Sequence, residues 1–432
     1  MPDKLNMFLN RKHIGEIILD ATNDLYELNY SPDWISEGGY PVSPHLKFES
    51  SPNDAVKRFL ANLLPEGKWL EELSVNTRVS KANIFGLIAA IGKETTGALT
   101  FEMDGQSPAT SGTGFREIPQ EELTQRIRER QERSIAIWDG KPRLSVAGLQ
   151  DKLPILIMGD GRMGFGEGDL ASTHILKFGT SPQIHLAVNE FICMKLAGMV
   201  GLPTAEVELT RMGEPVLVVK RFDRQREGTH LVNRLHLIDG CQMLDLPPIF
   251  KYERPFGKGG NAAGIRTGAS LPALFAACGN CRAPAVAMRD LLNWLLFQLL
   301  IANSDAHAKN ISFFVGPAGI DVAPAYDLVC LDIYGDKYER DLSMAIGDTF
   351  GVDDIKAFQL AEMCEECKLP QRQVAKTFLT LCQRMLLKLE EVALPADLTD
   401  EEKGFAATMM EMIRERTLVY LDHAKKLPKV EL

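Results

Sequence analysis

The most constraining feature of the sequence is a polar segment that directly follows its most apolar run. Residues 290–303 read DLLNWLLFQLLIAN, which is apolar nearly all round and therefore predicts a buried helix. The segment SDAHAKN, Ser304 to Asn310, comes next, and a strand-like ISFFV follows it. Ionisable groups beside a buried helix cost free energy unless they have partners or a function. SDAHAKN is therefore a candidate functional loop.

The spacing inside this loop points to phosphoryl transfer. Asp305 and Asn310 fit the pattern D-x-x-x-x-N of kinase catalytic loops, in which the Asp accepts the proton of the attacking hydroxyl and the Asn binds a metal ion. Asp327, in PAYDLVC, follows a second short strand, and in kinases a further Asp at such a place holds Mg²⁺. The residues alone leave a structural alternative open, in which Asp305 is a cap and His307 a hydrogen-bonded turn residue.

Length, charge and cysteine content indicate more than one domain and disfavour a membrane-spanning, secreted or autonomously DNA-binding protein. A chain of 432 residues suggests more than one domain, since a single core rarely grows past about 250–300 residues. A net charge of −10 disfavours autonomous DNA binding. The longest charge-free apolar run, Leu291 to Ser304, is shorter than the ~20 residues of a bilayer helix, and no signal peptide is expected at the N-terminus. Eight cysteines without such a signal indicate the cytoplasm.

The order of expected elements predicts an α+β fold. Strands are expected at NMFLNRKHIGEI and LYELNY, followed by a helix with Asn53 as a possible N-cap and another at KANIFGLIAAIG. The middle third predicts hairpins at 153–168 and 205–224, a strand THILKF and a helix at 185–201 that Gly201 ends. The last third is dominated by amphipathic helices at 373–394 and 404–427. A strand-rich lobe and a helical lobe with a cleft between them are expected.

Several further motifs have two readings. Lys177, in THILKF, suits the lysine that holds ATP phosphates, but exposed strand-end lysines are common. SVAGLQDK, with Lys152, is a candidate phosphate loop, whereas the G-x-G-x-x-G match at Gly159 is better explained as a hairpin turn. Two CxxC pairs, Cys278/Cys281 and Cys364/Cys367, could hold zinc, but their separation favours unligated thiols.

Five motifs together resemble one family. SVAGLQDK, HILKF, KRFDR, SDAHAKN and AYDL, in that order, are similar to the HipA-type serine/threonine kinases, the toxins of bacterial type II toxin–antitoxin pairs. The resemblance covers nearly the whole chain and implies a two-lobed, protein-kinase-like α+β fold. Its parts would be an extra N-terminal subdomain (1–135), a strand-rich, ATP-binding N-terminal lobe (136–250) and an all-helical C-terminal lobe (251–432).

The resemblance implies a role for each matching residue. Asp305 would be the catalytic base, Asn310 and Asp327 would bind Mg²⁺, and Lys177 would hold the phosphates of ATP. Ser145 would be autophosphorylated, which inactivates the kinase. The other expected nucleotide contacts are the phosphate loop Ala147, Gly148, Leu149, Gln150, Asp151 and Lys152, the hinge Lys220, Arg221 and Phe222, and His307, Ala308, Lys309 and Tyr326. Lys220 departs from the best-known members, which carry an acidic residue there.

The resemblance also implies ATP and Mg²⁺ as cofactors and a protein Ser/Thr as the acceptor. In the family the target is typically an aminoacyl-tRNA synthetase, and its phosphorylation arrests growth and produces persistence. A small helix-turn-helix antitoxin of the HipB kind would be the partner, and operator DNA would be bound through that complex, repressing their operon. No membrane association is expected.

Two alternatives remain. One is a catalytically silent co-repressor or binding protein. The other is a small-molecule phosphotransferase, although its H-x-D-x-x-x-x-N loop would need His where Asn303 stands. Residues 251–268, KYERPFGKGGNAAGIRTG, are interpreted as a mobile surface loop that could help to bind a protein substrate.

Overall fold

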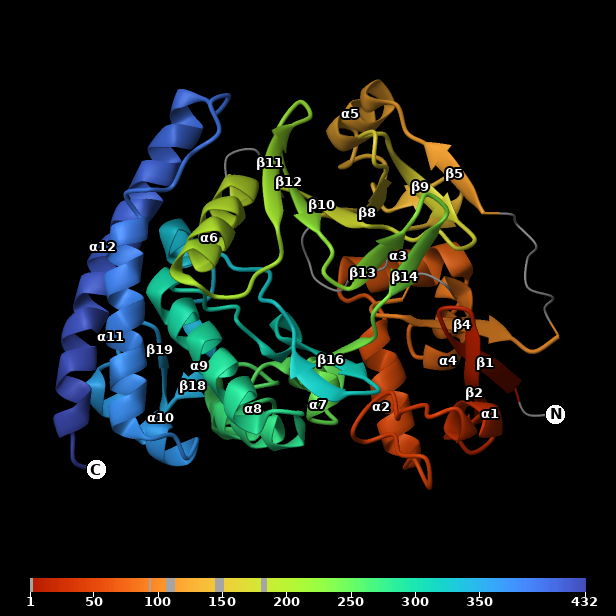
Figure 1. Cartoon of the computed structure of the whole chain (residues 1–432), viewed down its shortest axis with the longest axis horizontal. Helices are drawn as coiled ribbons and strands as arrows, with labels where there is room; N and C mark the ends of the chain where they lie inside the picture. The colour runs from red at the N-terminus through yellow and green to blue at the C-terminus, as the bar shows by residue number, and fades with distance from the viewer. Residues whose placement is uncertain (1–2, 93–94, 106–112, 144–150, 180–184) are drawn as a thin grey trace. The chain divides into compact units, whose positions relative to one another are not determined.

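The computed structural model describes residues 3–92, 95–105, 113–143, 151–179 and 185–432. The chain divides into two compact units, each of which mixes helices and strands (Figure 1). Unit 1 comprises Met1–Thr180, Thr210–Ile238 and Phe314–Gly319, and unit 2 comprises Ser181–Leu209, Asp239–Phe313 and Ile320–Leu432. The α+β class expected from the sequence is confirmed, while the three-part division into domains stays a prediction.

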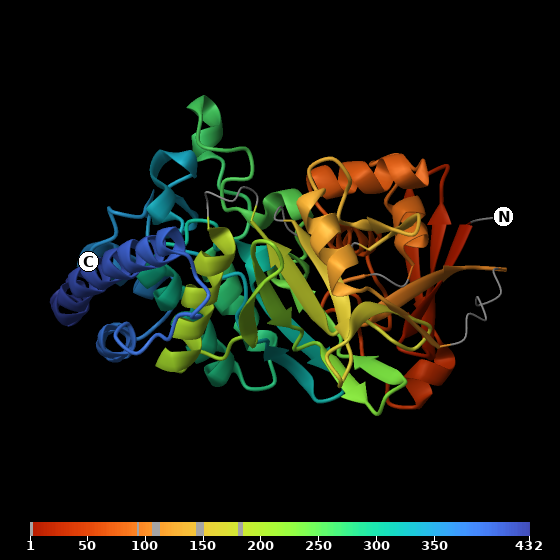
Figure 2. The same cartoon turned by 90° about the horizontal axis from the view of Figure 1, so that it is seen from above.

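Unit 1 begins with a four-stranded antiparallel sheet in the order β3-β2-β1-β4, drawn in red to orange in Figure 2. The stretch NMFLNRKHIGEI forms two strands rather than one, because Asn10 turns the chain with a positive φ of 56°. Asn53 is the first residue of α2 and not its N-cap; its side chain accepts a hydrogen bond from the Tyr26 N–H instead. The elements are β1 (Asp3–Leu9), β2 (Lys12–Asp20), β3 (Leu25–Tyr30), β4 (Leu99–Met103), α1 (Pro32–Ser36), α2 (Asn53–Leu63), α3 (Lys68–Thr77) and α4 (Ile84–Ile91).

A second sheet has six strands in the order β11-β12-β10-β8-β9-β5. The predicted hairpin at 153–168 is confirmed, and Gly161, with φ +88°, lies in its turn, where a side chain would be strained. The strands are β5 (Gly114–Glu117), β8 (Lys152–Ile157), β9 (Met163–Glu167), β10 (His174–Phe178), β11 (Val207–Arg211) and β12 (Pro215–Lys220). Smaller elements of unit 1 are α5 (Gln120–Arg128), β6 (Ile137–Trp138), β7 (Lys141–Pro142), β13 (Arg224–Glu227) and β14 (Leu231–Arg234).

Unit 2 is built around the apolar helix α9 (Pro284–Ile301), which packs against α11 (Gln371–Lys388) and α12 (Asp400–Lys426). All three helices were predicted. The predicted end of α6 (Leu186–Val200) at Gly201 is also confirmed, with Gly201 in the left-handed conformation at φ +96°. The remaining helices are α7 (Gly240–Met243), α8 (Leu271–Ala277) and α10 (Ala357–Glu366), and the 3₁₀ segments are η2 (Pro248–Lys251), η3 (Gly260–Gly264), η4 (Cys278–Asn280), η5 (Ala308–Asn310), η6 (Asp332–Lys337) and η7 (Leu427–Lys429).

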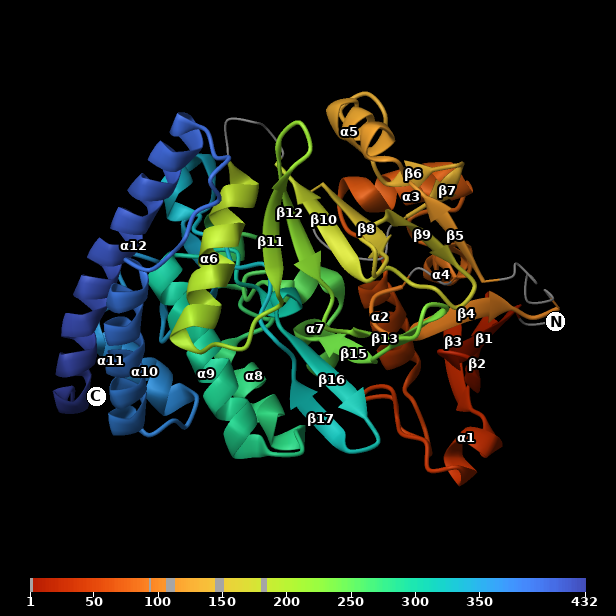
Figure 3. The same cartoon turned by 45° about the horizontal axis from the view of Figure 1, so that its top comes forward.

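The expectation of an all-helical C-terminal lobe is corrected by four strands within 251–432. β16 (Ser312–Gly316) and β17 (Gly319–Val322) form a hairpin visible in Figure 3, and β15 (Leu237–Asp239) completes their sheet. β18 (Asp341–Ile346) pairs with β19 (Thr349–Gly351). The reason is that buried backbone N–H and C=O groups on both sides of the SDAHAKN loop need partners, and extended segments supply them to each other.

By length and composition, one helix among the described residues, α9, is apolar enough to cross a membrane. This corrects the expectation that no segment is long enough. Within its fold, however, 61% of that stretch is buried, as in the core helix of a globular protein.

Candidate active site

The SDAHAKN loop is tied together by side-chain amides. α9 ends at Ile301, and the residue that caps it, Ala302, is left-handed with φ +51°. Asn303 follows; its Oδ1 accepts from the Asp305 N–H at 3.2 Å and its Nδ2 donates to the Asp327 carbonyl at 3.4 Å. The amide of Asn310 donates to the Asp305 carbonyl at 2.9 Å. Asp305, Asn310 and Asp327 are thus brought together within unit 2.

Asn310 and Asp327 each carry oxygen atoms of the kind that Mg²⁺ prefers. Because the Asn310 NH₂ group is engaged by Asp305, the amide oxygen is the atom that remains for a cation. Asp327 lies in the left-handed region with φ +59°, a costly conformation that surrounding contacts must maintain. Among the described residues, no three His, Cys, Asp or Glu side chains converge to form a metal cage. Two protein oxygens combined with substrate phosphates are the usual way in which Mg²⁺ is held.

His307 is buried and electrically neutral. Burial, assisted by the nearby Lys251 ammonium, lowers the pKa of His307 to about 3. Its Nδ1 makes no hydrogen bond within the described part of the chain. The alternative of a fully hydrogen-bonded turn residue is therefore not supported at this atom.

The second half of the loop is held by the start of α7. The Lys309 ammonium contacts the Asp239 carboxylate at 2.5 Å, and Tyr326 donates to the Lys309 carbonyl at 2.8 Å. Gly240 donates its N–H to the carbonyl of Ile311 at 2.9 Å, and a Cβ there would lie 2.4 Å from the Ala308 carbonyl oxygen. The loop residues expected around the nucleotide are thus positioned by close backbone contact.

The other expected nucleotide residues lie in unit 1. Lys152 and Lys177 are directly opposite each other on β8 and β10, and both are buried, so the reading of Lys177 as an exposed strand-end lysine is wrong. Asp151 pairs with Lys68, and its Oδ2 lies 3.7 Å from Arg130 Nε. Ser145, Ala147, Gly148, Leu149 and Gln150 lie outside the described residues.

Part of the expected hinge already forms hydrogen bonds within unit 1. The Arg221 N–H donates to the Thr173 carbonyl at 2.9 Å, so this N–H is already used within the sheet. The Arg221 guanidinium donates two hydrogen bonds to the Asp223 carboxylate, at 2.9 and 2.8 Å. Desolvation raises the pKa of this buried Asp, but the neighbouring arginines outweigh it and lower the pKa to about 2. Lys220 is exposed, and the Phe222 ring packs edge-on against Phe314. An adenine contact by the Arg221 N–H is therefore disfavoured.

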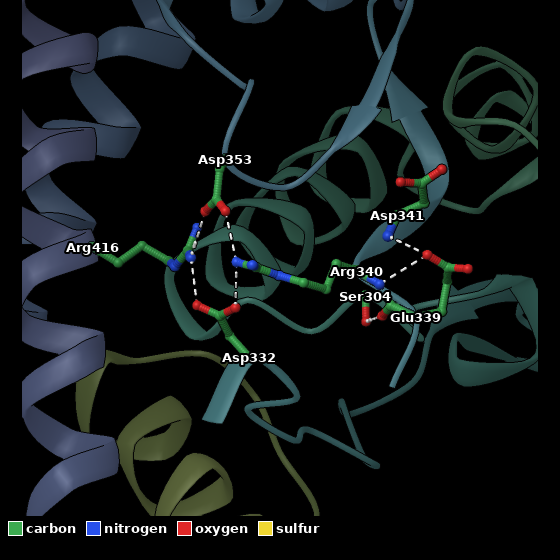
Figure 4. A network of polar contacts seen from close by, with 7 residues as sticks. All are labelled: Ser304, Asp332, Glu339, Arg340, Asp341, Asp353 and Arg416. Carbon is green, nitrogen blue, oxygen red and sulfur yellow. Dashed lines mark hydrogen bonds and ion pairs between the residues drawn. The ribbon is translucent and has the colours of Figure 1, made fainter. Parts of the chain in front are cut away.

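A network of arginines and carboxylates adjoins Ser304, the first residue of the SDAHAKN loop (Figure 4). Ser304 donates to the Glu339 carbonyl at 2.6 Å, and the adjoining Arg340 contacts Asp332 and Asp353 at 2.8 and 2.6 Å. Arg416 of α12 contacts the same two carboxylates at 2.7 and 3.0 Å. The network joins the segment that follows Asp327 to the C-terminal helix.

Sequence reasoning missed two residues that contact this site. The Tyr252 hydroxyl donates to Asp305 Oδ1 at 2.7 Å, and Asn189 of α6 binds the backbone of Cys330, three positions after Asp327. Tyr252 belongs to the stretch interpreted as a mobile surface loop; that interpretation is wrong for residues 251–253, because Lys251 and Glu253 are buried. The signal available in the sequence was the pair of charged residues, Lys251 and Glu253, on either side of Tyr252.

Comparison with known proteins identifies the family of the chain. A family model described as "HipA-like C-terminal domain" matches residues 144–389, and one described as "HipA N-terminal domain" matches residues 5–102. The chain is 40% identical over 432 residues to the "Serine/threonine-protein kinase toxin HipA" of Shewanella oneidensis, covering 99% of this chain and 98% of that protein.

A solved structure, titled as the toxin–antitoxin system HipA, HipB and its operator DNA complex from Shewanella oneidensis MR-1, contains a similar fold. The TM-score is 0.90 at 40% identity, covering 99% of this chain and 100% of the other. Motifs, fold and full-length similarity agree, and the chain belongs to the HipA family of serine/threonine-protein kinase toxins.

Proposed function

We propose that the chain transfers the γ-phosphoryl group of ATP to a Ser or Thr hydroxyl of a protein, with Asp305 as the general base. The observation that carries this is the linkage of Asp305 and Asp327 through Asn303, with Asn310 bound to Asp305 at 2.9 Å. Asn310 and Asp327 would hold Mg²⁺, which neutralises phosphate charge when bound. Phosphoryl transfer depends mainly on such positioning and on electrostatic stabilisation.

Lys177 is proposed to hold the ATP phosphates, and the stretch from Ala147 to Lys152 to form the phosphate loop. The register of β8 and β10 supports this, since it places the side chains of Lys152 and Lys177 opposite each other on one face of the sheet. Lys220, Arg221 and Phe222 are proposed as the hinge, meeting adenine through backbone atoms other than the Arg221 N–H. His307, Ala308, Lys309 and Tyr326 would line the nucleotide.

Ser145 is proposed as an autophosphorylation site that inactivates the kinase. A phosphate there would add a charge of about −2 beside the phosphate loop and repel ATP. Intact-mass spectrometry after incubation of dephosphorylated protein with ATP and Mg²⁺ tests both proposals. We expect one added phosphate (about 80 Da, the group in) in the parent and none in Asp305→Asn or Ser145→Ala. An unmodified parent would favour a silent co-repressor, and equal labelling of Asp305→Asn would remove Asp305 from its role.

We further propose that the chain acts with a helix-turn-helix antitoxin to bind operator DNA. The solved relative is a HipA–HipB–DNA complex, and a net charge of −10 suits DNA contact made mainly through a partner. An electrophoretic mobility shift with the operator, the antitoxin and this chain tests the proposal. We expect the chain to shift DNA only when the antitoxin is present.

The protein acceptor is proposed to be an aminoacyl-tRNA synthetase, and the compartment the cytoplasm. Phosphorylation of a synthetase by the parent, but not by Asp305→Asn, would support this acceptor. Growth arrest on expression of the parent alone is the corresponding cellular result.

A further inference from the structure

We infer that Tyr252 is a positioning residue for Asp305, holding the carboxylate in one orientation toward the acceptor hydroxyl. The inference rests on the proposed role of Asp305 as general base. Tyr252 lies in the chain 53 positions before Asp305, and its hydroxyl donates to Asp305 Oδ1 at 2.7 Å. A phenol is protonated at neutral pH, so this contact is a hydrogen bond from a neutral donor to an anionic acceptor.

The backbone on either side of this contact is held by a single residue of β18. Ser343 donates to the Ser304 carbonyl through both its N–H, at 2.9 Å, and its hydroxyl, at 2.7 Å. The Ser343 carbonyl in turn accepts from the Glu253 N–H at 2.9 Å. Ser304 precedes Asp305 and Glu253 follows Tyr252, so the two ends of the hydrogen bond are fixed relative to the same strand residue.

The segment that carries Tyr252 is anchored by the buried Glu253. Its Oε2 accepts from the Ala345 N–H at 2.8 Å, and its Oε1 accepts from Arg266 Nε at 2.6 Å. Gly268 donates to the Glu253 carbonyl at 3.1 Å, and a Cβ on Gly268 would lie 1.8 Å from the Tyr252 carbonyl oxygen. This backbone therefore cannot shift without breaking several buried contacts, which distinguishes it from a loop that opens and closes.

Packing fixes the ring as well as the backbone. The Tyr252 ring meets the neutral His307 ring edge-to-face, with centroids 5.1 Å apart and an interplanar angle of 81°. The ammonium of the buried Lys251 also lies 5.2 Å from the Tyr252 ring centroid. The hydroxyl is thus presented to Asp305 before any substrate binds, which is the condition for positioning a base without reorganisation during transfer.

The substitution Tyr252→Phe tests this, because it removes only the hydroxyl and keeps the ring packing. The rate constant of phosphate transfer from ATP onto dephosphorylated protein is measured in single turnover against ATP concentration. We expect the maximal rate constant to fall about tenfold, the effect of one hydrogen bond to a charged group, with the half-saturating ATP concentration unchanged. Tyr26→Phe, which removes a hydroxyl in β3, is the matched control and should behave like the parent.

The outcomes separate the inference from the proposed function. A parent that transfers no phosphate would overturn the proposed function and, with it, this inference. If the parent is active and the maximal rate constant of Tyr252→Phe is equal to or higher than that of the parent, the inference alone is overturned. A higher rate constant would mean that the tyrosine obstructs the acceptor. A fall in rate that parallels a fall in the thermal unfolding temperature, with a raised half-saturating ATP concentration, would mean a merely structural role and would also overturn it.

Discussion

The side-chain amide of Asn189 forms two hydrogen bonds with the backbone of Cys330. Nδ2 donates to the Cys330 carbonyl at 2.8 Å, and Oδ1 accepts from its N–H at 2.8 Å. Nδ2 also lies 3.0 Å from the Tyr334 hydroxyl, and Asn189 is fully buried. This pairing resembles the link between two neighbouring strands, but it joins α6 to the segment that follows Asp327. The proposed Mg²⁺ ligand therefore depends on a helix that is distant in sequence.

Replacement of Asn189 by Ala is expected to destabilise the protein by about 3 kcal/mol, because it leaves a buried N–H and a buried carbonyl without their partner. Urea unfolding followed by circular dichroism measures this. Asn280→Ala, at an exposed position, is the control and should change the free energy of unfolding by less than about 0.5 kcal/mol. A loss below 1 kcal/mol for Asn189→Ala would show that water replaces the amide.

The network in Figure 4 predicts unequal coupling between its ion pairs. The side chains of Arg416 and Asp332 are each only 14% exposed, whereas those of Arg340 and Asp353 are 44% and 58% exposed. Double-mutant cycles with Ala should give a coupling energy of about 1–3 kcal/mol for Arg416–Asp332 and below about 1 kcal/mol for Arg340–Asp353. Equal coupling in the two cycles would contradict the expectation that the less exposed Arg416–Asp332 pair is the stronger one.

The burial of His236 predicts that the free energy of unfolding falls as the pH drops from 6.5 toward 4. Burial lowers the pKa of His236 to about 4 from its ordinary 6.5, although the ring bonds to the Val42 carbonyl at 2.8 Å. Below pH 6.5 the unfolded chain binds a proton that the folded chain does not, so this stability is present above pH 6.5 and is lost as the pH falls toward 4. The contribution of His236 to the free energy of unfolding should fall by about 2 kcal/mol between pH 7 and pH 5.

His236→Gln isolates that contribution, because the amide can still donate to Val42 while it does not titrate. Urea titrations at pH 7 and pH 5 should show that the free energy of unfolding decreases less in the variant than in the parent. His307, whose pKa burial also lowers, is present in both proteins and cancels in the comparison. Identical decreases in the two proteins would refute the assignment to His236.

Asp327→Asn should raise the Mg²⁺ concentration needed for phosphate transfer and lower the maximal rate by at least about a hundredfold, because a charged metal ligand becomes neutral. Transfer from ATP is measured against Mg²⁺ concentration, and chelation by EDTA should stop it in the parent. Asp321→Asn, in β17 and paired with Arg282, is the matched carboxylate control. An unchanged Mg²⁺ dependence in Asp327→Asn would exclude this residue as a metal ligand.

Elements with strong local signals were predicted correctly. Apolar residues all round α9, a glycine after α6 and the Gly-Asp-Gly turn between β8 and β9 act over a few residues, so they can be recognised without knowledge of the fold. The spacing of Asp305 and Asn310 is local in the same sense, and the Asn310–Asp305 hydrogen bond brings those two together. Element boundaries were less certain, as the β1–β2 turn at Asn10 shows.

Contacts between distant segments required the tertiary structure. Asn189 and Cys330 are separated by 141 positions, and Tyr252 and Asp305 by 53. No periodicity marks either end of such a pair, because the partner of a buried polar group is set by how elements pack and not by its neighbours in the chain. The sequence alone therefore predicted the main elements, the family and a phosphoryl-transfer role to be tested for the SDAHAKN loop, whereas packing decided which side chains contact Asp305 and the segment after Asp327.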